Sequence, residues 1–414
     1  MMERYKAYKE SGLPWLGTMP EHWEVKRIKD IFTEISDKGY ADEPILCSTQ
    51  KFGVIPQSMY ENRIVIVNKG LENLKLVRQG NFVISLRSFQ GGIEYAHYQG
   101  IISAAYTVLQ LAKGFNEIYI KYLLKSSAFI QLLQICTTGI REGRNVNYSV
   151  LKQESLPVPP LEEQRAIAEY LDRETVRIDR IVELLTKQRE RYAQLKRSLI
   201  SEVVTHGLPH HNPANYRTLR LKDIVSSFET GKRETTSIEE VLSIGGEHIQ
   251  NGKFFLENPR YVSKEFYNSN NGKIKIGDTL VVKDGATIGK SMFVDSLPSE
   301  QMLLNEHVYR LEPNRLFCLP IYLYYIINST ATQEYFRAMN MSTAQESITR
   351  ITMNSLPISL PPLEEQQEIV AYLDERCKRL DRLVEAIDRK IELLGSLKKS
   401  LIEEVVTGQR RITN

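Results

Sequence analysis

Six residues, Pro-Pro-Leu-Glu-Glu-Gln, occupy positions 159–164 and return unchanged at positions 361–366. The likeness extends well beyond them, because roughly 25 of the 47 positions from 159 to 205 are identical to those 202 residues later. An internal repeat of this length constrains the architecture of a chain before any other pattern is considered. The sequence therefore predicts two similar halves, each with a globular region followed by a long helix.

The segment that follows each hexapeptide carries a helical pattern. A pair of prolines suits the start of a helix, and the two glutamates favour the positive end of its dipole. Apolar residues then recur in steps of three and four, as in the seam of a coiled coil. The predicted seam consists of Ile167, Leu171, Ile178, Ile181, Leu185, Leu195 and Leu199 in the first copy and of Ile369, Leu373, Leu380, Leu383, Ile387, Leu397 and Leu401 in the second.

Polar residues interrupt each seam at the same repeat positions, Glu174 and Gln188 in the first copy and Arg376 and Lys390 in the second. They could fix the register of the two helices, or they could simply be tolerated near solvent. A helix of about 45 residues is roughly 65 Å long, and alone it would expose its apolar seam. Two copies related by a pseudo-twofold axis would pair antiparallel, and two separate helices, each packed on its own domain, are the alternative.

The globular regions mix strand-like and helical patterns. Segments 63–67, 81–86 and 279–282 are typical of strands, whereas 119–133 and 320–339 are typical of helices. The predicted fold is therefore α+β, with two α/β domains separated by two long helices that form an antiparallel coiled coil with an internal pseudo-twofold repeat. The predicted boundaries are 1–158 for the first domain, 159–206 for the first helix, 207–358 for the second domain and 359–414 for the second helix.

Composition excludes several classes of protein. The apolar content of 42% is ordinary for a soluble globular chain, and no stretch approaches the roughly 18 consecutive apolar residues of a membrane helix. The 4 cysteines are scattered without a CxxC pair, so neither a disulfide framework nor a structural zinc site is indicated, and a reducing cytoplasm is expected. Lysine plus arginine number 54 against 51 acidic residues, so any nucleic-acid surface must come from local clustering.

Motifs for catalysis or metal binding are incomplete. The nearest approach to a phosphate loop is at 285–291, but only three residues separate Gly285 from Gly289 where the motif needs four. The following residues, 292–294, are typical of a strand rather than a helix. His210 and His211 could bind a metal ion, although an adjacent pair in a polar linker is expected to be solvated.

The repeated hexapeptides, the long helices and the two α+β regions resemble the specificity subunit of Type I restriction-modification systems. Residues 8–17, followed by Pro-Glu-His-Trp at 20–23, look like the frequent N-terminus of that family. Residues 277–290, Gly-Asp-Thr-Leu-Val-Val-Lys-Asp-Gly-Ala-Thr-Ile-Gly-Lys, look like a recurring stretch of its target-recognition domains. The resemblance spans essentially the whole chain.

The resemblance implies a function as well as a fold. In that family each globular region reads one half of a bipartite, asymmetric DNA site, and the paired helices dock two methyltransferase subunits. Restriction subunits with motor and nuclease activity complete an assembly that methylates adenine or cleaves unmodified DNA. The resemblance thus implies a noncatalytic chain without cofactor or metal ion, with S-adenosylmethionine, ATP and Mg used by partner subunits. A coiled-coil scaffold whose heads bind protein is the alternative.

Candidates for DNA contact are polar residues on loops, since phosphate contacts position a protein and contacts to base edges specify the sequence. Arginine and lysine can address guanine, whereas asparagine and glutamine suit adenine. The alternative for each candidate is a solvated loop residue. The predicted DNA-binding set is Arg87, Ser88, Gln90, Arg141, Arg144, Asn145, Asn147 and Tyr148 in the first domain, and Lys283, Lys290, Gln345 and Arg350 in the second.

Overall fold

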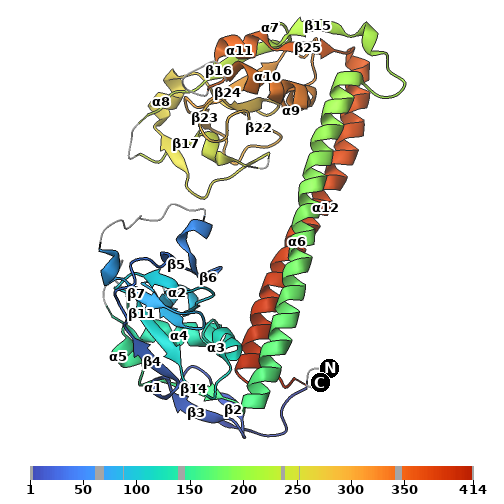
Figure 1. Cartoon of the computed structure of the whole chain (residues 1–414). Helices are drawn as coiled ribbons and strands as arrows, with labels where there is room; N and C mark the ends of the chain where they lie inside the picture. The colour runs from blue at the N-terminus through green and yellow to red at the C-terminus, as the bar shows by residue number, and fades with distance from the viewer. Residues whose placement is uncertain are drawn as a thin grey trace. The chain divides into compact units, whose positions relative to one another are not determined.

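The computed structural model describes residues 3–60, 70–86, 88–138, 145–234, 238–250, 252–340 and 347–412. The chain divides into two compact units, one of residues 1–185 and 389–414 and the other of residues 186–388. Each unit contains one α+β domain and a part of both long helices (Figure 1). The predicted α+β class is thereby confirmed. Among the described residues, no helix combines the length and the apolar character needed to cross a membrane.

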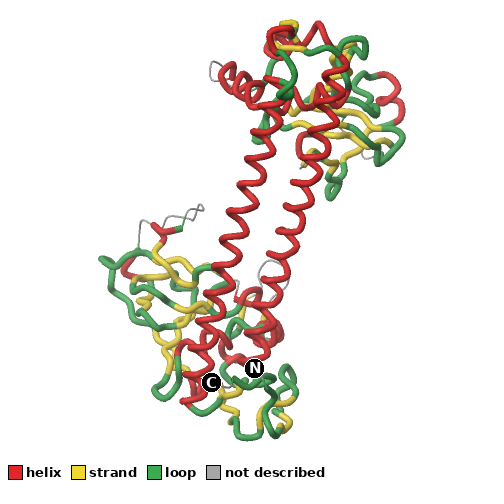
Figure 2. Tube along the Cα trace, turned by 90° about the vertical axis from the view of Figure 1, so that its right-hand side faces the viewer, coloured by secondary structure: helices red, strands yellow, loops and turns green. Residues whose placement is uncertain are grey.

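The two long helices begin directly after the two Pro-Pro pairs, as predicted. Helix α6 runs from Leu161 to His206 and α12 from Leu363 to Val406. Figure 1, where α6 is green and α12 orange to red, and Figure 2 both show them side by side. Each unit contains the first part of one helix and the last part of the other.

Two ion pairs define how the helices are paired. In the first unit, Lys398 Nζ lies 2.6 Å from Asp179 Oδ1, and in the second, Lys196 Nζ lies 2.7 Å from Asp381 Oδ1. Lys196 and Lys398 occupy the same position of the repeat, and so do Asp179 and Asp381. The same contact is therefore made once in each unit, which confirms the predicted antiparallel pairing with pseudo-twofold symmetry.

The buried face of the helices departs from a strict heptad pattern. In α6, Ile167 is buried. Leu195, which follows it by four heptads, is 53% exposed. A straight helix drifts by about 20° per heptad relative to a 3.5-residue repeat. Over four heptads the drift is about 80°, nearly one residue, and the buried positions at the end of α6 are accordingly Ile200 and Val203.

The outcome for the predicted seam follows from this drift. Seven of its residues are buried, namely Ile167, Leu171, Ile178, Ile369, Leu373, Ile387 and Leu401. Ile181, Leu185, Leu199 and Leu380 are half-buried. The prediction was wrong for Leu195, Leu383 and Leu397, which are 53%, 39% and 54% exposed.

The interruptions of the seam have the same explanation. Beside Glu174 and Arg376, the next residues, Thr175 and Cys377, are the buried ones, each 5% exposed. Arg376 itself is exposed, as are Gln188 and Lys390. Three of the four polar residues thus lie in solvent beside the buried face. This favours the interpretation that they are tolerated near solvent over the one in which they fix the register of the helices.

The domain of the first unit is built on a four-stranded antiparallel sheet in the order β4-β11-β8-β9. Among the described residues of this domain, α-helices accompany the sheet. The segment predicted as one helix at 119–133 is divided at Ser126, which caps the second part. The sheet strands are Phe32–Ile35 (β4), Thr107–Leu111 (β11), Phe82–Ile84 (β8) and Glu94–Tyr95 (β9). The helices are Ile28–Ile31 (α1), Ser88–Gly91 (α2), Glu117–Leu123 (α3), Ser127–Ile135 (α4) and Tyr148–Leu151 (α5). Paired strands beside the sheet are Tyr8–Glu10 (β1) with Thr18–Pro20 (β2), Glu24–Arg27 (β3) with Ser155–Val158 (β14), Leu46–Thr49 (β5) with Gly53–Pro56 (β6), Lys75–Val77 (β7) with Gly100–Ile102 (β10), and Thr137–Thr138 (β12) with Asn145–Val146 (β13).

The domain of the second unit repeats this plan, with a four-stranded antiparallel sheet in the order β16-β24-β21-β22. The sheet strands are Val225–Thr230 (β16), Val308–Pro313 (β24), Thr279–Val282 (β21) and Ser291–Phe293 (β22). A second sheet contains Arg260–Val262 (β20), Val241–Ile244 (β17) and Met302–Leu304 (β23), and the remaining pairs are Arg217–Arg220 (β15) with Pro357–Leu360 (β25) and Ile249–Gln250 (β18) with Lys253–Phe254 (β19). The helices are Leu221–Ile224 (α7), Lys264–Ser269 (α8), Pro320–Asn328 (α9), Thr330–Asn340 (α10) and Arg350–Ser355 (α11).

The glutamine of each hexapeptide joins a domain to the long helices. Gln164 is buried, and its Oε1 accepts a hydrogen bond from the backbone N–H of Asn116 at 2.8 Å. In the second unit, Gln366 Oε1 accepts one from the N–H of Leu319 at 2.9 Å. Asn116 and Leu319 are the N-cap residues of α3 and α9. Each glutamine therefore ties the start of a long helix to the start of a domain helix, which accounts for its place in the repeat.

Asp172 and Asp374, which occupy the same position of the repeat, provide a second attachment. The Tyr122 hydroxyl of α3 donates to Asp172 Oδ1 at 2.7 Å, and the Tyr325 hydroxyl of α9 donates to Asp374 Oδ1 at 2.7 Å. Burial, together with the neighbouring carboxylate, raises the pKa of both tyrosines, so these hydroxyls remain donors. The same two contacts thus seat both domains, although the domain sequences are only weakly alike.

Candidate nucleic-acid interface

The twelve predicted DNA-binding residues fall into three groups. Arg87, Arg141, Arg144 and Gln345 lie outside the described residues. Ser88, Asn147 and Tyr148 contribute to the fold. Gln90, Asn145, Lys290 and Arg350 are exposed, and Lys283 is half-buried. The structure thus leaves Gln90 and Asn145 in the first domain, and Lys283, Lys290 and Arg350 in the second, as described candidates.

Three of the predicted residues serve the backbone or the core. Ser88 is 2% exposed, and its hydroxyl accepts a hydrogen bond from the Ser85 N–H at 2.9 Å, so its prediction as a DNA contact is corrected. Asn147 caps α5, with Oδ1 accepting from the Ser149 N–H at 3.0 Å, and Tyr148 packs against the core. Turns and helix starts recruit the same short polar residues as DNA contacts do, which is why the sequence pattern did not separate the two roles.

Gln90 lines a polar cleft in the first domain with a volume of 660 Å³. The turn between β5 and β6 contributes Gln50 and Lys51 to the same cleft, and Phe52 beside them is 49% exposed. Sequence reasoning missed this turn, although a Gln-Lys pair between two strand-like segments was a usable signal. The cleft therefore combines amide, ammonium and aromatic groups, which are the side chains that address base edges, phosphates and base faces.

A buried carboxylate forms one wall of the cleft. Glu94 is 2% exposed, and its Oε1 lies 2.5 Å from Lys125 Nζ. The other oxygen, Oε2, is buried, and no donor among the described residues forms a hydrogen bond with it. Burial raises the pKa of Glu94 to about 7, and the Lys125 ammonium opposes this shift.

The raised pKa of Glu94 makes the stability of the first unit depend on pH. Between pH ~4.5 and about 7 the unfolded chain loses a proton that the folded chain keeps, so this group stabilises the unit below pH ~4.5 and the contribution is lost as pH rises through about 7. Relative to Glu94→Gln, the wild-type chain is expected to lose on the order of 3 kcal/mol of unfolding free energy from pH 4.5 to pH 8. Urea unfolding of both proteins across this range measures the difference. The exposed Glu10→Gln serves as control, and a wild-type-minus-variant difference that stays constant with pH would contradict the prediction.

In the second domain, the DNA-binding candidates Arg350 and Lys283 each lie over one ring of an aromatic pair. The Arg350 guanidinium lies 4.7 Å from the centroid of the Phe228 ring, and its Nη2 donates to the Phe228 carbonyl at 2.6 Å. The Phe228 and Tyr309 rings contact edge to face with centroids 4.7 Å apart, and Lys283 Nζ lies 5.6 Å from the Tyr309 centroid. The structure thus brings Lys283, which follows β21, and Arg350, at the start of α11, to two rings on the adjacent strands β16 and β24.

The stretch 277–290 has a structural role besides any contact with DNA. Arg310 of β24 is 3% exposed and lies 3.1 Å from Asp278 Oδ1, 3.1 Å from Glu229 Oε2 and 3.0 Å from Glu312 Oε2. Asp278 also accepts the Lys275 N–H at 2.7 Å. The aspartate of this stretch therefore neutralises an arginine inside the domain and closes the turn before β21.

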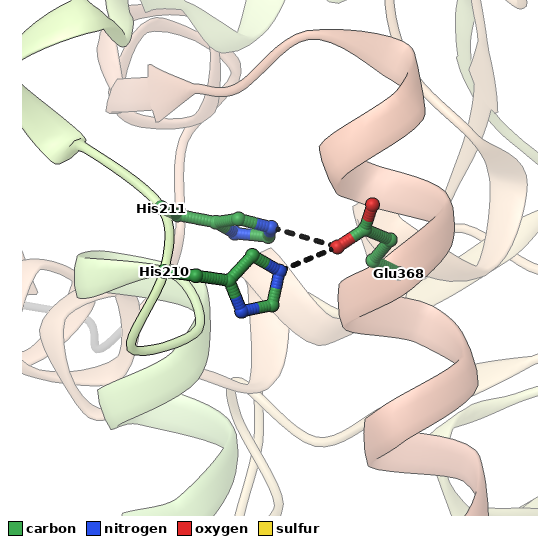
Figure 3. Close-up of side chains that lie close together, drawn as sticks. All are labelled: His210, His211 and Glu368. Carbon is green, nitrogen blue, oxygen red and sulfur yellow. Dashed lines mark hydrogen bonds and ion pairs between the residues drawn. The ribbon is translucent and has the colours of Figure 1, made fainter.

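His210 and His211 are not simply a solvated pair. The His211 side chain is 4% exposed, and both Nε2 atoms lie at Glu368 Oε2, 2.8 Å from His210 and 3.1 Å from His211 (Figure 3). The histidines lie in the loop after α6, and Glu368 lies in the second turn of α12. Sequence reasoning missed Glu368, because it is far away in the chain.

The sequence is similar to a known protein family and to individual members of it. A family model described as Type I restriction modification DNA specificity domain matches residues 20–190 and again residues 213–393. The Type I restriction enzyme MjaVIII specificity subunit of Methanocaldococcus jannaschii is 24% identical, with 96% of this chain and 95% of that protein covered. The StySPI specificity subunit of Salmonella potsdam is 21% identical, with 95% and 90% covered.

Two solved structures share the fold. A chain from a structural study of complex assembly and conformational transition in a type I R-M system matches with a TM-score of 0.69 at 17% identity, over 94% of this chain and 98% of that one. The HsdS subunit from Thermoanaerobacter tengcongensis matches with a TM-score of 0.50 at 18% identity, over the same shares, 94% and 98%. Because the family model matches well over half of the sequence, the chain belongs to the Type I restriction-modification DNA specificity family and is a DNA-recognition subunit of that kind.

Proposed function

We propose that this chain reads a bipartite, asymmetric DNA site, with one α+β domain for each half-site, and takes no catalytic part itself. The observation that carries the proposal is that two different domains are attached to the long helices in the same way. The sheets have matching strand orders, β4-β11-β8-β9 and β16-β24-β21-β22, and both domains are attached through the same glutamine and aspartate of the repeat. One protein thereby carries two versions of one recognition module.

The two domains present different chemistry, which supports an asymmetric site. In the first, Gln90 and Gln50 line the cleft, and glutamine can form two hydrogen bonds with adenine. In the second, Lys290 is exposed and Lys283 and Arg350 flank an aromatic pair, and basic side chains suit guanine and phosphates. Domains of this kind are expected to select different half-sites. A coiled-coil scaffold with protein-binding heads is less well supported, since it explains neither set of side chains.

The long helices supply a docking surface for two copies of one partner. Leu195 in the second unit and Leu397 in the first occupy the same repeat position and are 53% and 54% exposed. Exposed leucines on a helix suit a protein interface, and their duplication suits two equal interfaces. We assign these to two methyltransferase subunits, which use S-adenosylmethionine. Restriction subunits, which use ATP and Mg, would complete the assembly.

The experiment that tests the function is co-expression with the methyltransferase subunit, followed by sequencing of methylated adenines in the host DNA. The expected result is one bipartite motif that disappears without this chain. Gln90→Ala is expected to relax the choice of base in one half of the motif, and Lys290→Ala is expected to weaken methylation through the other half. A base contact contributes about 1–3 kcal/mol of discrimination.

Exposed residues of the same types provide matched controls. Gln153→Ala in the first domain and Lys222→Ala in the second are expected to leave the motif and the extent of methylation unchanged. If Gln90→Ala and Lys290→Ala altered the same half of the motif, one domain per half-site would be ruled out. Methylation that does not depend on this chain would favour the scaffold.

A further inference from the structure

We propose that His210, His211 and Glu368 form a binding site for one divalent transition-metal ion of the zinc class. The three side chains converge from the loop after α6 and from α12, all within the second unit (Figure 3). Their ligand atoms, both Nε2 atoms and a Glu368 oxygen, lie within 4.8 Å of one another. The proposal does not depend on DNA recognition, and it departs from the expectation of a chain without a metal ion.

The distances suit a tetrahedral ion after a small adjustment. The two nitrogens lie 2.8 and 3.1 Å from Glu368 Oε2. Zinc bonds of about 2.0–2.1 Å place tetrahedral ligand atoms about 3.3 Å apart, so the side chains need to separate by only a few tenths of an ångström. Two imidazoles and one carboxylate are a donor set that zinc accepts, with a fourth position open to water.

Binding of an ion at Nε2 requires His211 to change its tautomer. Its Nδ1 accepts the Leu208 N–H at 3.1 Å, so in the metal-free arrangement the proton lies on Nε2 and points to Glu368. An ion at Nε2 requires the other neutral tautomer, with the proton on Nδ1, so the Leu208 N–H loses this acceptor. The Glu365 carboxylate, which interacts with the Tyr216 hydroxyl, has its Oε2 3.4 Å from Nδ1. It is placed to receive the relocated proton, as the carboxylate partners of metal-bound histidines do.

The repeat shows that this cluster is an addition to the shared scaffold. Ala166 occupies the position in the first copy that Glu368 occupies in the second. Glu163, the counterpart of Glu365, already accepts from the Tyr5 hydroxyl at 2.6 Å and from Trp23 Nε1 at 3.1 Å. The first long helix therefore begins and packs without a carboxylate at the position of Glu368, so Glu368 is not required for the start of the helix.

Bound metal would join the loop after α6 to the second turn of α12. An ion that binds only the folded state shifts the folding equilibrium toward it. The site is therefore expected to stabilise the second unit and leave the first unchanged.

Titration of the untagged, chelator-treated full-length chain with Co²⁺ tests the proposal, because tetrahedral Co²⁺ has a visible d–d absorption. We expect one equivalent of Co²⁺, displaced by one equivalent of Zn²⁺. His210→Ala and Glu368→Ala are expected to weaken binding at least as much as the 10–100-fold typical for loss of an outer carboxylate, and Glu365→Gln by about that factor. Glu368→Ala restores the residue of the first repeat, so it is expected to remain folded.

Two histidines provide controls for nonspecific surface binding. His206, 62% exposed and 3.6 Å from Glu202, and His22, paired with Glu163, are each expected to tolerate alanine without loss of Co²⁺ binding. Absence of a saturable equivalent in the wild-type chain would overturn the proposal. Equal affinity in Glu368→Ala, or an equal loss in His206→Ala, would also overturn it.

Discussion

Leu171→Asp is expected to unfold the first unit, and Leu373→Asp the second. Both leucines are fully buried in the cores that join a domain to the long helices. A carboxylate at either position would be buried without a partner, and such substitutions destabilise by more than about 4 kcal/mol. Domains of this size are stable by about 5–15 kcal/mol, so most of the stability of one unit would be lost.

Circular dichroism during urea unfolding measures the effect, with each variant expected to alter the transition of its own unit. Leu195→Asp and Leu397→Asp are the matched controls, since they belong to the same leucine series but are half exposed. They are expected to change the unfolding free energy by no more than about 0.5 kcal/mol. If Leu195→Asp lowered the unfolding free energy as much as Leu373→Asp, the buried face would follow the heptad series and would not shift to Ile200 and Val203.

Gln366→Leu is expected to destabilise the second unit by about 3–5 kcal/mol. The Gln366 amide is fully buried and donates to the carbonyls of Phe317 and Pro361 at 2.8 and 2.9 Å, while it accepts the Leu319 N–H at 2.9 Å. Leucine of similar size leaves these three backbone groups without partners, at about 1–3 kcal/mol each. Gln164 makes two such bonds, to Asn116 and Pro159, so Gln164→Leu is expected to cost less.

The neighbouring Gln367 is exposed, and Gln367→Leu is the control that keeps the chemistry of the substitution and removes the burial. It is expected to be nearly neutral in thermal or urea unfolding. Gln366→Glu separates shape from hydrogen bonding, because a carboxyl oxygen would replace the donor facing two carbonyls. A Gln366→Leu chain as stable as the Gln367→Leu chain would show that the amide does not hold the domain.

The long helices were predictable from sequence because their signals are local. The prolines and glutamates of the hexapeptide mark a helix start wherever they occur, and both helices begin there. The exposed Leu195 was not predictable in the same way. A series of leucines fits periods of 3.5 and 3.6 almost equally well, and the two separate only over several heptads. Thr175, a buried polar residue on the same face, was not counted as part of the apolar series.

The candidate sites were less predictable from sequence than the long helices. Ser88 and Asn147 are residue types shared by DNA contacts, turns and helix caps, so only coordinates could assign them to the backbone. The burial of His211 depends on Glu368 and Glu365, more than 150 residues away. The cluster of Arg350 and Lys283 likewise depends on the pairing of β16 with β24. Contacts between distant segments carry no local pattern.

The matched ion pairs have a consequence for how such genes change length. The interval from Asp179 to Lys196 in α6 equals the interval from Asp381 to Lys398 in α12, and each aspartate binds the lysine of the opposite helix. Codons inserted within one interval alone would pull one pair out of register. Equal insertions in both would preserve both pairs. Length variants that keep both ion pairs are therefore expected to carry equal insertions in the two intervals.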